Sequence, residues 1–295
     1  MGVVVNTNIS SISASRILSG NRADLEKAME RLSSGKRINS AKDDAAGMAV
    51  AAKMRADIRS LNQAVRNTND AISLVNTYDG AAQEIENILI RMRELAVQSK
   101  NGTYESADRT NANYEYTALK TEIQRIANVT SFNRQLVGNG SGSVGASADT
   151  SFSFYVGSDV TKTGNTVTFS AGGVDMNLTE GAFDSTVTDA SVSSGLRTIL
   201  TQGAAASAVN QIDSALGNLA ARRSQAGALI NRLEHTVSNL MNVSQRLSEA
   251  VSGIEDADYA GESANLARGM VLAQAGTAML AQANQSPQYI LTLLR

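Results

Sequence analysis

IDSALGNLAARRSQAGALINRLEHTVSNLMNVSQRLSEAVSGI, residues 212–254, is the longest regular stretch of this sequence. Its apolar residues recur every three or four positions, at Ile212, Leu216, Leu219, Ala226, Ile230, Leu233, Val237, Leu240, Val243, Leu247, Val251 and Ile254. These steps place side chains on one face of an α-helix and form a seam typical of a coiled coil. A seam of this length needs apolar partners along its whole face. The stretch therefore predicts a long helix packed against other helices.

Two further seams with the same spacing lie in the first half of the chain. The longer runs from Ile58 through Leu61, Val65, Ile72, Val75, Ala82, Ile85, Leu89, Met92 and Leu95, with polar breaks at Thr68 and Asp79. Asn101-Gly102-Thr103 then supplies a helix-stop and turn signal, and a shorter seam follows at Ala112, Tyr116, Leu119, Ile123 and Ile126. Because the two long helices and the short one each need an apolar partner, we expect the chain to double back. The predicted fold is mainly α, a long antiparallel coiled-coil helical rod.

Between the long seams, residues 138–195 change to Gly, Ser, Thr, Asp and Val, and the helical spacing disappears. SFSFYVG (151–157) and NTVTFSAGG (165–173) alternate apolar with small polar residues, and TKTGN (161–165) between them has the composition of a turn. We therefore predict a small β-hairpin region at the middle of the chain.

The two ends have their own patterns. Residues 1–39 show a looser amphipathic pattern that stops at Ser33-Ser34-Gly35, after which Ser40 is expected to cap the next helix with Asp43 in a variant capping box. Residues 261–286 are rich in Ala, Gly and Gln, and no charged residue occurs between Arg268 and Arg295. Interspersed polar residues keep this stretch below the hydrophobicity of a membrane span. We expect a helix buried against other protein, ordered only when neighbouring subunits add packing.

Composition argues against several classes of function. The net charge of −2 is spread without a basic stripe, which argues against nucleic acid, and the absence of cysteine removes disulfides and thiolate metal sites. The single histidine, His235, lies within the long seam helix, so a two-histidine zinc motif cannot form and a serine-histidine-aspartate arrangement lacks its strand-turn setting. The position of Asp43-Asp44 at a helix start is explained by capping and the helix dipole, Gly35-Lys36 lacks the preceding glycine and the following Ser or Thr of a phosphate loop, and IEDAD (254–258) lacks calcium-loop spacing. We expect neither enzyme activity nor a cofactor.

RLSSGKRINSAKDDAAGMA (31–49) resembles the N-terminal region of bacterial flagellins almost word for word. MRELAVQSKNGT (92–103), TSFN (130–133), NRLEHTVSNL (231–240) and residues 254–295 are similarly flagellin-like. The resemblance implies an inner-tube domain of residues 1–45 with 255–295 and a rod domain of residues 46–254. Only the short variable segment at about 138–195 is available for an outer region, so no large outer domain is expected. Arg134, Gly253 and Gly261 depart from the usual family pattern.

In function, the resemblance implies a structural subunit that polymerises into the bacterial flagellar filament used for swimming. The N-terminus lacks a secretory signal peptide, and the family leaves the cell unfolded by the flagellar type III route and assembles at the distal tip. Implied partners are further copies of the chain, other flagellins, an export chaperone at the C-terminal region, and the filament cap and hook-junction proteins. The resemblance therefore implies that the chain is secreted and becomes part of an extracellular filament. We expect no membrane span in the chain.

Two sets of site residues follow from these arguments. The predicted polymerisation interface comprises Ile9, Ile12, Leu18, Leu266, Leu272, Met279, Leu280, Ile290, Leu293 and Leu294. By resemblance, recognition by Toll-like receptor 5 would involve Arg91, Leu95 and Glu115. The alternative functions are a hook-filament junction protein, which shares such terminal helices, and a membrane-active secreted helical protein, against which the sparsely basic ends argue.

Overall fold

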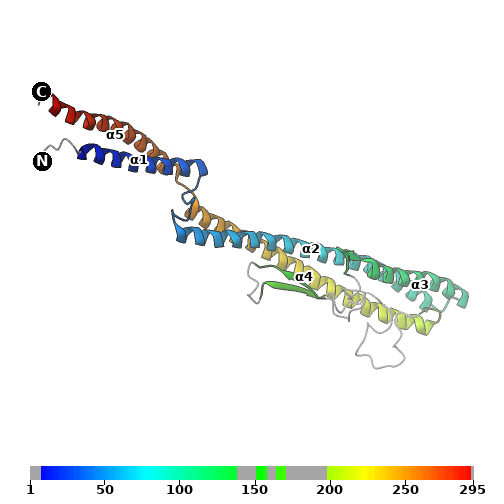
Figure 1. The fold of residues 1–295 in the computed structure, drawn as a ribbon. Helices are drawn as coiled ribbons and strands as arrows, with labels where there is room; N and C mark the ends of the chain where they lie inside the picture. The colour runs from blue at the N-terminus through cyan, green and yellow to red at the C-terminus, as the bar shows by residue number, and fades with distance from the viewer. Residues whose placement is uncertain (1–7, 138–150, 158–163, 171–197, 294–295) are drawn as a thin grey trace. The chain divides into compact units, whose positions relative to one another are not determined.

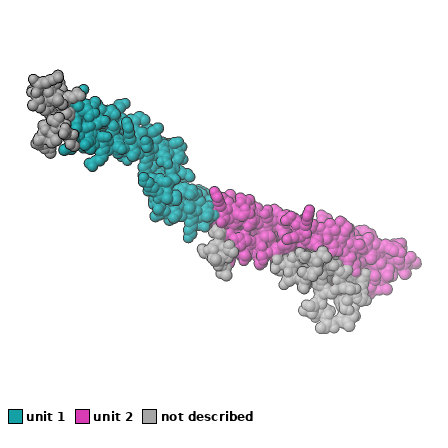
Figure 2. Space-filling model, in the orientation of Figure 1, with its two compact units in different colours: residues 1–58, 244–295 teal, residues 59–243 magenta. Residues whose placement is uncertain are grey.

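The computed structural model describes residues 8–137, 151–157, 164–170 and 198–293. Within them lie the helices α1 (Ile9–Ser34), α2 (Ala45–Lys100), α3 (Ser106–Val129), α4 (Gln202–Glu255) and α5 (Tyr259–Leu293) (Figure 1). The chain divides into two compact units, residues 1–58 with 244–295 and residues 59–243 (Figure 2). Each unit thus combines segments from both halves of the sequence, and the predicted mainly helical fold is confirmed.

The core of the unit formed by residues 59–243 joins the three predicted seams. Leu89 and Met92 of α2, Tyr116 and Ile123 of α3, and Ile212 of α4 belong to one cluster of buried side chains. Each of these side chains is at most 2% exposed. The apolar seams are therefore satisfied by one another, as the spacing of the sequence predicts.

Ion pairs along the helices show the direction of packing. Arg93 of α2 binds Asp213 of α4 with 2.6 Å between Nε and Oδ1. Further along α4, Arg223 pairs with Glu86, which comes earlier in α2. Because later residues of α4 meet earlier residues of α2, the two helices are antiparallel, as predicted from their need for a shared apolar face.

The two polar breaks in the seam of α2 have different roles. Thr68 is fully buried, and its hydroxyl donates to the carbonyl oxygen of Ala64 at 2.7 Å, so the polar atom is satisfied within the helix. Asp79 lies at the edge of the seam and binds the guanidinium of Arg223 with 2.8 Å between Nε and Oδ1. Neither break interrupts α2, because each polar group has a partner.

The predicted β-hairpin is present. Strands β3 (Ser151–Tyr155) and β4 (Thr166–Ser170) are antiparallel and pair Phe152 with Phe169. Phe169 is buried and meets Tyr78 of α2 edge-on, with 5.4 Å between ring centroids. The alternating pattern thus places one face of the hairpin on the helices. Residues 161–163 of the predicted turn, and most of the remaining variable segment, lie outside the described residues.

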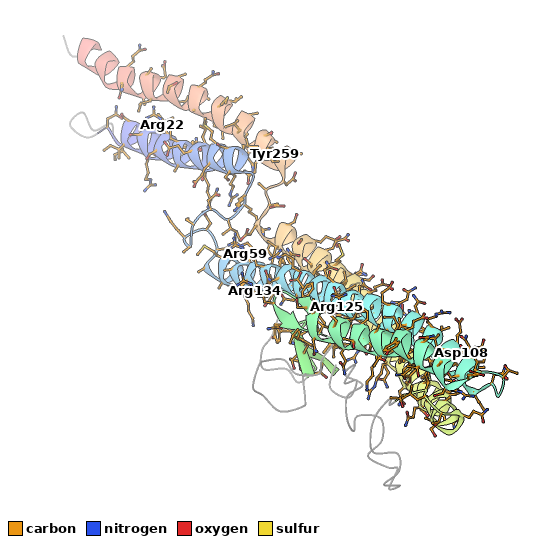
Figure 3. The ribbon with its side chains drawn as sticks, turned by 90° about the vertical axis from the view of Figure 1, so that its right-hand side faces the viewer. Arg22, Arg59, Asp108, Arg125, Arg134 and Tyr259 are labelled. Atoms are coloured by element: carbon orange, nitrogen blue, oxygen red, sulfur yellow. The ribbon has the colours of Figure 1, made fainter. Side chains whose placement is uncertain are left out.

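A second hairpin was missed by the sequence analysis. Strands β1 (Ser131–Phe132) and β2 (Gln135–Leu136) are joined by Asn133 and Arg134, whose φ angles are +50° and +65°. Two positive φ angles in a two-residue loop are typical of a type I′ turn, for which Asn-Gly is the usual signal. Arginine in place of that glycine (labelled in Figure 3) weakened the signal.

Replacing Arg134 by glycine is expected to stabilise the chain by up to about 1 kcal/mol. Glycine adopts a φ of +65° without the clash of a Cβ atom, although its greater freedom in the unfolded state offsets part of the gain. The measurement is the free energy of unfolding in urea. The control is Gln135→Gly in the adjoining strand, which should lower that free energy, and a fall of equal size in both variants would contradict the strain argument.

The predicted cap of the second helix is wrong in detail. The helix begins at Ala45, and the Oδ1 of Asp44 accepts from the amide of Gly47 at 2.8 Å, so Asp44 is the capping side chain. Ser40 instead belongs to a separate turn, in which its hydroxyl donates to Asp43 at 3.0 Å. Both aspartates were candidates by type, and the preceding turn occupies the first of them.

Candidate assembly surface

The N- and C-terminal helices α1 and α5 lie side by side (Figure 1). Two glycines of α5 face leucines of α1 in this contact. A Cβ atom added at Gly276 would lie 3.2 Å from Cδ1 of Leu18, and one added at Gly269 would lie 3.5 Å from the side chain of Leu25. Leu18 therefore occupies space that a side chain at Gly276 would fill, whereas the distance at Gly269 is an ordinary van der Waals contact.

Polar contacts hold both ends of this helix pair. Arg31 binds Glu262 with 2.7 Å between Nη1 and Oε1, and both side chains are largely shielded from solvent. At the opposite end, the side-chain amide of Asn8 donates to the carbonyl of Ala283 at 2.8 Å. The beginning of α1 thus meets the later part of α5, so the pair is antiparallel.

The segments that lead into α2 and out of α4 are also tied together. The amide of Ala257 donates to the carbonyl of Gly35 at 3.0 Å, and the amide of Arg37 donates to that of Glu255 at 2.6 Å. Gly35 ends α1 with a φ of +70°, and the hydroxyl of Tyr259 (labelled in Figure 3) would lie 3.3 Å from a Cβ atom there. These backbone contacts were missed because they pair residues more than 200 positions apart.

One carboxylate of this region is unusually acidic. The amide of Ser40 donates to Asp43 at 3.0 Å, and the Nζ of Lys27 lies 3.2 Å from it. These contacts, the backbone hydrogen bond first, lower the pKa of Asp43 from 3.8 to about 2. Because the folded pKa lies below the unfolded value, the contribution to stability is present above about pH 4 and is lost as the pH falls toward 2.

The substitution Asp43→Asn is therefore expected to destabilise the chain at neutral pH, and its difference from the wild type should shrink between pH 4 and pH 2. The measurement is the difference in free energy of unfolding between the two proteins at each pH. A difference that stays constant across this window would show that Asp43 does not carry the effect.

Large apolar side chains remain exposed on both helices of the pair. On α1 these are Ile9, Ile12, Ile17 and Met29, and on α5, beyond its first residue Tyr259, they are Met270, Val271, Leu272 and Met279. We name these eight residues the assembly surface. Val271 is 65% exposed and Met279 is 64% exposed, values at which apolar side chains make few contacts within the chain. Since each residue turns a helix by about 100°, those on α5 fall on its flanks and back as well as near its packed face.

The exposed apolar residues of α5 lie on more of its circumference than one partner covers. The helix α1 covers one side of α5, and large apolar side chains are exposed beyond that side. No charged side chain lies on α5 after Arg268. The described structure thus contains a helix whose remaining faces suit contact with further protein.

The predicted interface residues differ in how exposed their side chains are. Ile9, Ile12, Leu272 and Met279 are exposed, and Leu266 and Leu280 are half-buried. Leu18 is instead buried against α5 at 7% exposure, so it has little surface for a neighbouring copy, and we reassign it to the contact within the chain. The side chains of Ile290 and Leu293, and all of Leu294, lie outside the described residues.

The predicted receptor residues are also only partly brought together. Arg91 of α2 binds Glu115 of α3 with 2.8 Å between Nε and Oε1, and it binds Glu94 as well. These carboxylates, Glu115 first, raise the pKa of Arg91. Leu95 is 3% exposed and belongs to the core, so it is not part of that surface. A periodic leucine in the seam already indicated this outcome.

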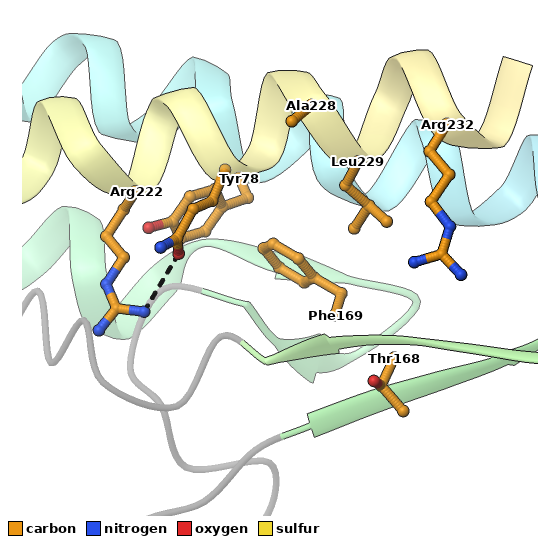
Figure 4. A pocket seen from close by; sticks show the side chains of 8 residues that line it. Tyr78, Thr168, Phe169, Arg222, Ala228, Leu229 and Arg232 are labelled. Carbon is orange, nitrogen blue, oxygen red and sulfur yellow. Dashed lines mark hydrogen bonds between the residues drawn. The ribbon is translucent and has the colours of Figure 1, made fainter.

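A cavity of about 330 Å³ lies beside α4 and β4 (Figure 4). Tyr78, Phe169 and Leu229 line it, with Arg222 and Arg232 among its polar residues. Burial raises the pKa of Tyr78 to about 12, so its hydroxyl stays protonated near neutral pH. The described lining residues therefore supply no general base.

Neither a metal site nor a membrane crossing is found among the described residues. Within those ranges, no group of three or more His, Cys, Asp or Glu side chains is placed to hold a metal ion. No described helix combines the length and hydrophobicity that a membrane crossing requires. His235 is exposed on α4. The assembly surface is thus the most distinctive candidate site.

Comparison with known proteins identifies the family of the chain. The family models for the bacterial flagellin N-terminal and C-terminal helical regions match residues 5–141 and 209–294. A flagellin from Halalkalibacterium halodurans is 42% identical, covering 99% of this chain and 100% of the relative. The flagellar filament 33 kDa core protein of Treponema phagedenis is 37% identical over the same shares. A solved Bacillus cereus flagellin is 31% identical, with a TM-score of 0.47 over 59% of this chain and 88% of that one. The chain therefore belongs to the bacterial flagellin family.

Proposed function

We propose that this chain is a structural subunit of the bacterial flagellar filament and that it polymerises through the assembly surface. The observation that carries the mechanism is α5, whose exposed apolar residues extend beyond the side covered by α1. Filament core proteins among the relatives support the subunit role. Val271, Leu272 and Met279 would be buried when further copies pack around α5.

The physical driving force is removal of apolar surface from water. Full burial of one large apolar side chain contributes about 1.5–3 kcal/mol, so several such residues give a stable contact between copies. A contact that joins different surfaces of neighbouring copies does not close on itself and generates an open helical polymer. Swimming motility is the use of such a filament.

The two ends of the chain and the segment between them have different roles, which follow the resemblance to flagellins. Residues 1–45 with 255–295 form the inner tube in this proposal, and residues 46–254 form the rod domain. The chain leaves the cell unfolded by the flagellar type III route, with an export chaperone on its C-terminal region. It then adds at the distal tip, between hook-junction and cap proteins, and becomes part of an extracellular filament.

Recognition by Toll-like receptor 5 is a secondary property of the same proposal. The accessible part of the predicted surface is the ion pair between Arg91 and Glu115, whose side chains are 51% and 46% exposed. Leu95 supports these helices from the core. The receptor would therefore contact the charged pair and not the leucine.

The test is seeded regrowth of filaments, observed by electron microscopy. Full-length chain, dissociated by heat, is expected to elongate filament seeds, whereas a chain lacking residues 261–295 is expected to stay monomeric. Circular dichroism should show that the truncated chain keeps the helices of residues 59–243, which form their own core.

The outcomes separate the alternatives. Binding of the chain to the ends of seeds without elongation would favour a hook-filament junction protein. Binding to liposomes without elongation would favour the membrane-active protein. Elongation by the truncated chain at the full-length rate would refute assembly through the terminal helices.

A further inference from the structure

Methionine is the only sulfur-containing residue type in this sequence. The sequence has nine methionines, no cysteine and no tryptophan. Thiolates normally react first with peroxides, and here none competes with the thioethers. The consequence of an oxidant therefore depends on where the methionine side chains lie.

The methionines of the described residues differ widely in exposure. Met29 of α1 is 52% exposed, and Met270 and Met279 of α5 are 48% and 64% exposed. All three belong to the assembly surface. By contrast, Met92 is fully buried in the core of α2, α3 and α4. Met241 of α4 is 59% exposed but lies on neither α1 nor α5.

We propose that Met29, Met270 and Met279 form an oxidation-sensitive site through which peroxides control assembly of the free subunit. This inference rests on the proposed function. The thioether sulfur attacks one oxygen of the peroxide, the O–O bond breaks, and the departing hydroxide takes the proton of the transferred oxygen to leave water. Methionine is oxidised to the sulfoxide and the peroxide is reduced.

Methionine sulfoxide is poorly suited to the apolar contact between copies. A sulfoxide replaces an apolar side chain with a polar one, and burying its oxygen without a hydrogen-bond donor is unfavourable. After Arg268, α5 offers such an oxygen only uncharged hydrogen-bond donors, for example Gln274 and Gln282. Oxidised subunits should therefore add to the filament more weakly.

Assembly should in turn protect these residues. Once neighbouring copies cover α5, the sulfur atoms of Met270 and Met279 are removed from solvent, whereas those of the free subunit stay accessible. Free subunits are therefore oxidised more readily than subunits within the filament. The lesion is reversible by methionine sulfoxide reductases, so it can act as a switch.

The experiment treats full-length monomers with hydrogen peroxide, measures sulfoxide at each methionine by peptide mass spectrometry, and follows elongation of filament seeds. Sulfoxide is expected at Met29, Met270 and Met279 well before Met92. The critical concentration for elongation should rise at least tenfold. In the variant Met29→Leu, Met270→Leu and Met279→Leu, treatment should not raise the critical concentration above the value that the same variant has before treatment.

The matched control is Met241→Leu, which removes an equally exposed methionine and should not protect elongation. Equal loss of elongation in the triple-leucine variant, or unchanged elongation of wild type oxidised at all three positions, would overturn the inference. Circular dichroism before treatment establishes that the variants are folded. Failure of untreated wild type to elongate seeds would instead overturn the proposed function and, with it, this inference.

Discussion

A chain that carries both Val271→Asp and Met279→Asp is expected to remain a folded monomer and to lose filament growth. Both side chains are more than 60% exposed, so the substitutions remove few contacts within the chain. Losing their burial between copies costs about 3–6 kcal/mol in total, and each 1.4 kcal/mol is tenfold in affinity. The critical concentration should rise at least about a hundredfold, measured by light scattering with seeds.

Two matched variants make this result specific. Val271→Leu with Met279→Leu keeps the surface apolar and should elongate seeds like wild type. Leu18→Ala, which changes a side chain buried against α5, should instead lower the thermal stability of the free chain. If the aspartate variant elongates normally, the exposed faces of α5 are not the contact between copies.

The largest effect on stability is expected from Leu233→Ala in α4. Leu233 is fully buried in a cluster with Ala71 of α2 and with Val156 and Val167 of the hairpin. Truncating such a leucine leaves a cavity and costs about 2–5 kcal/mol. Because the cluster joins both helices to the hairpin, urea unfolding followed by circular dichroism should show this loss.

An exposed residue of the same helix gives the control. Met241 is 59% exposed, so Met241→Ala should change the free energy of unfolding by no more than about 0.5 kcal/mol. Comparable losses in the two variants would mean that burial does not distinguish the two positions. The assignment of the seam face of α4 would then be wrong.

The main elements of the fold could be predicted because their signals are local. The recurrence of Ile212, Leu219 and Ala226 indicates a helix face whatever the partner, and all three side chains are buried. Gly35 marks the end of α1 because its φ of +70° suits a residue without a Cβ atom. The hairpin of β3 and β4 follows from a period of two.

The sequence-based prediction was wrong or missing for two local features, a helix cap and a turn. Asp43 and Asp44 are equally suited to cap a helix, and the choice depends on the contacts of Asp43 with Lys27 and Ser40. The turn at Asn133 and Arg134 was missed because arginine rarely adopts a positive φ. For the two aspartates, contacts outside the local pattern select the conformation.

The sequence by itself determined the helices and the central hairpin through their periodicity and the family through its motifs, and the pairing of the ends followed only from the resemblance to that family. Only the tertiary structure decided which apolar residues remain available to other copies. Leu18 and Val271 are similar apolar residues in sequence, yet Leu18 is buried against α5 and Val271 is 65% exposed. The reason is physical, since exposure depends on which face of a helix its partner covers, and the partner comes from the opposite end of the chain.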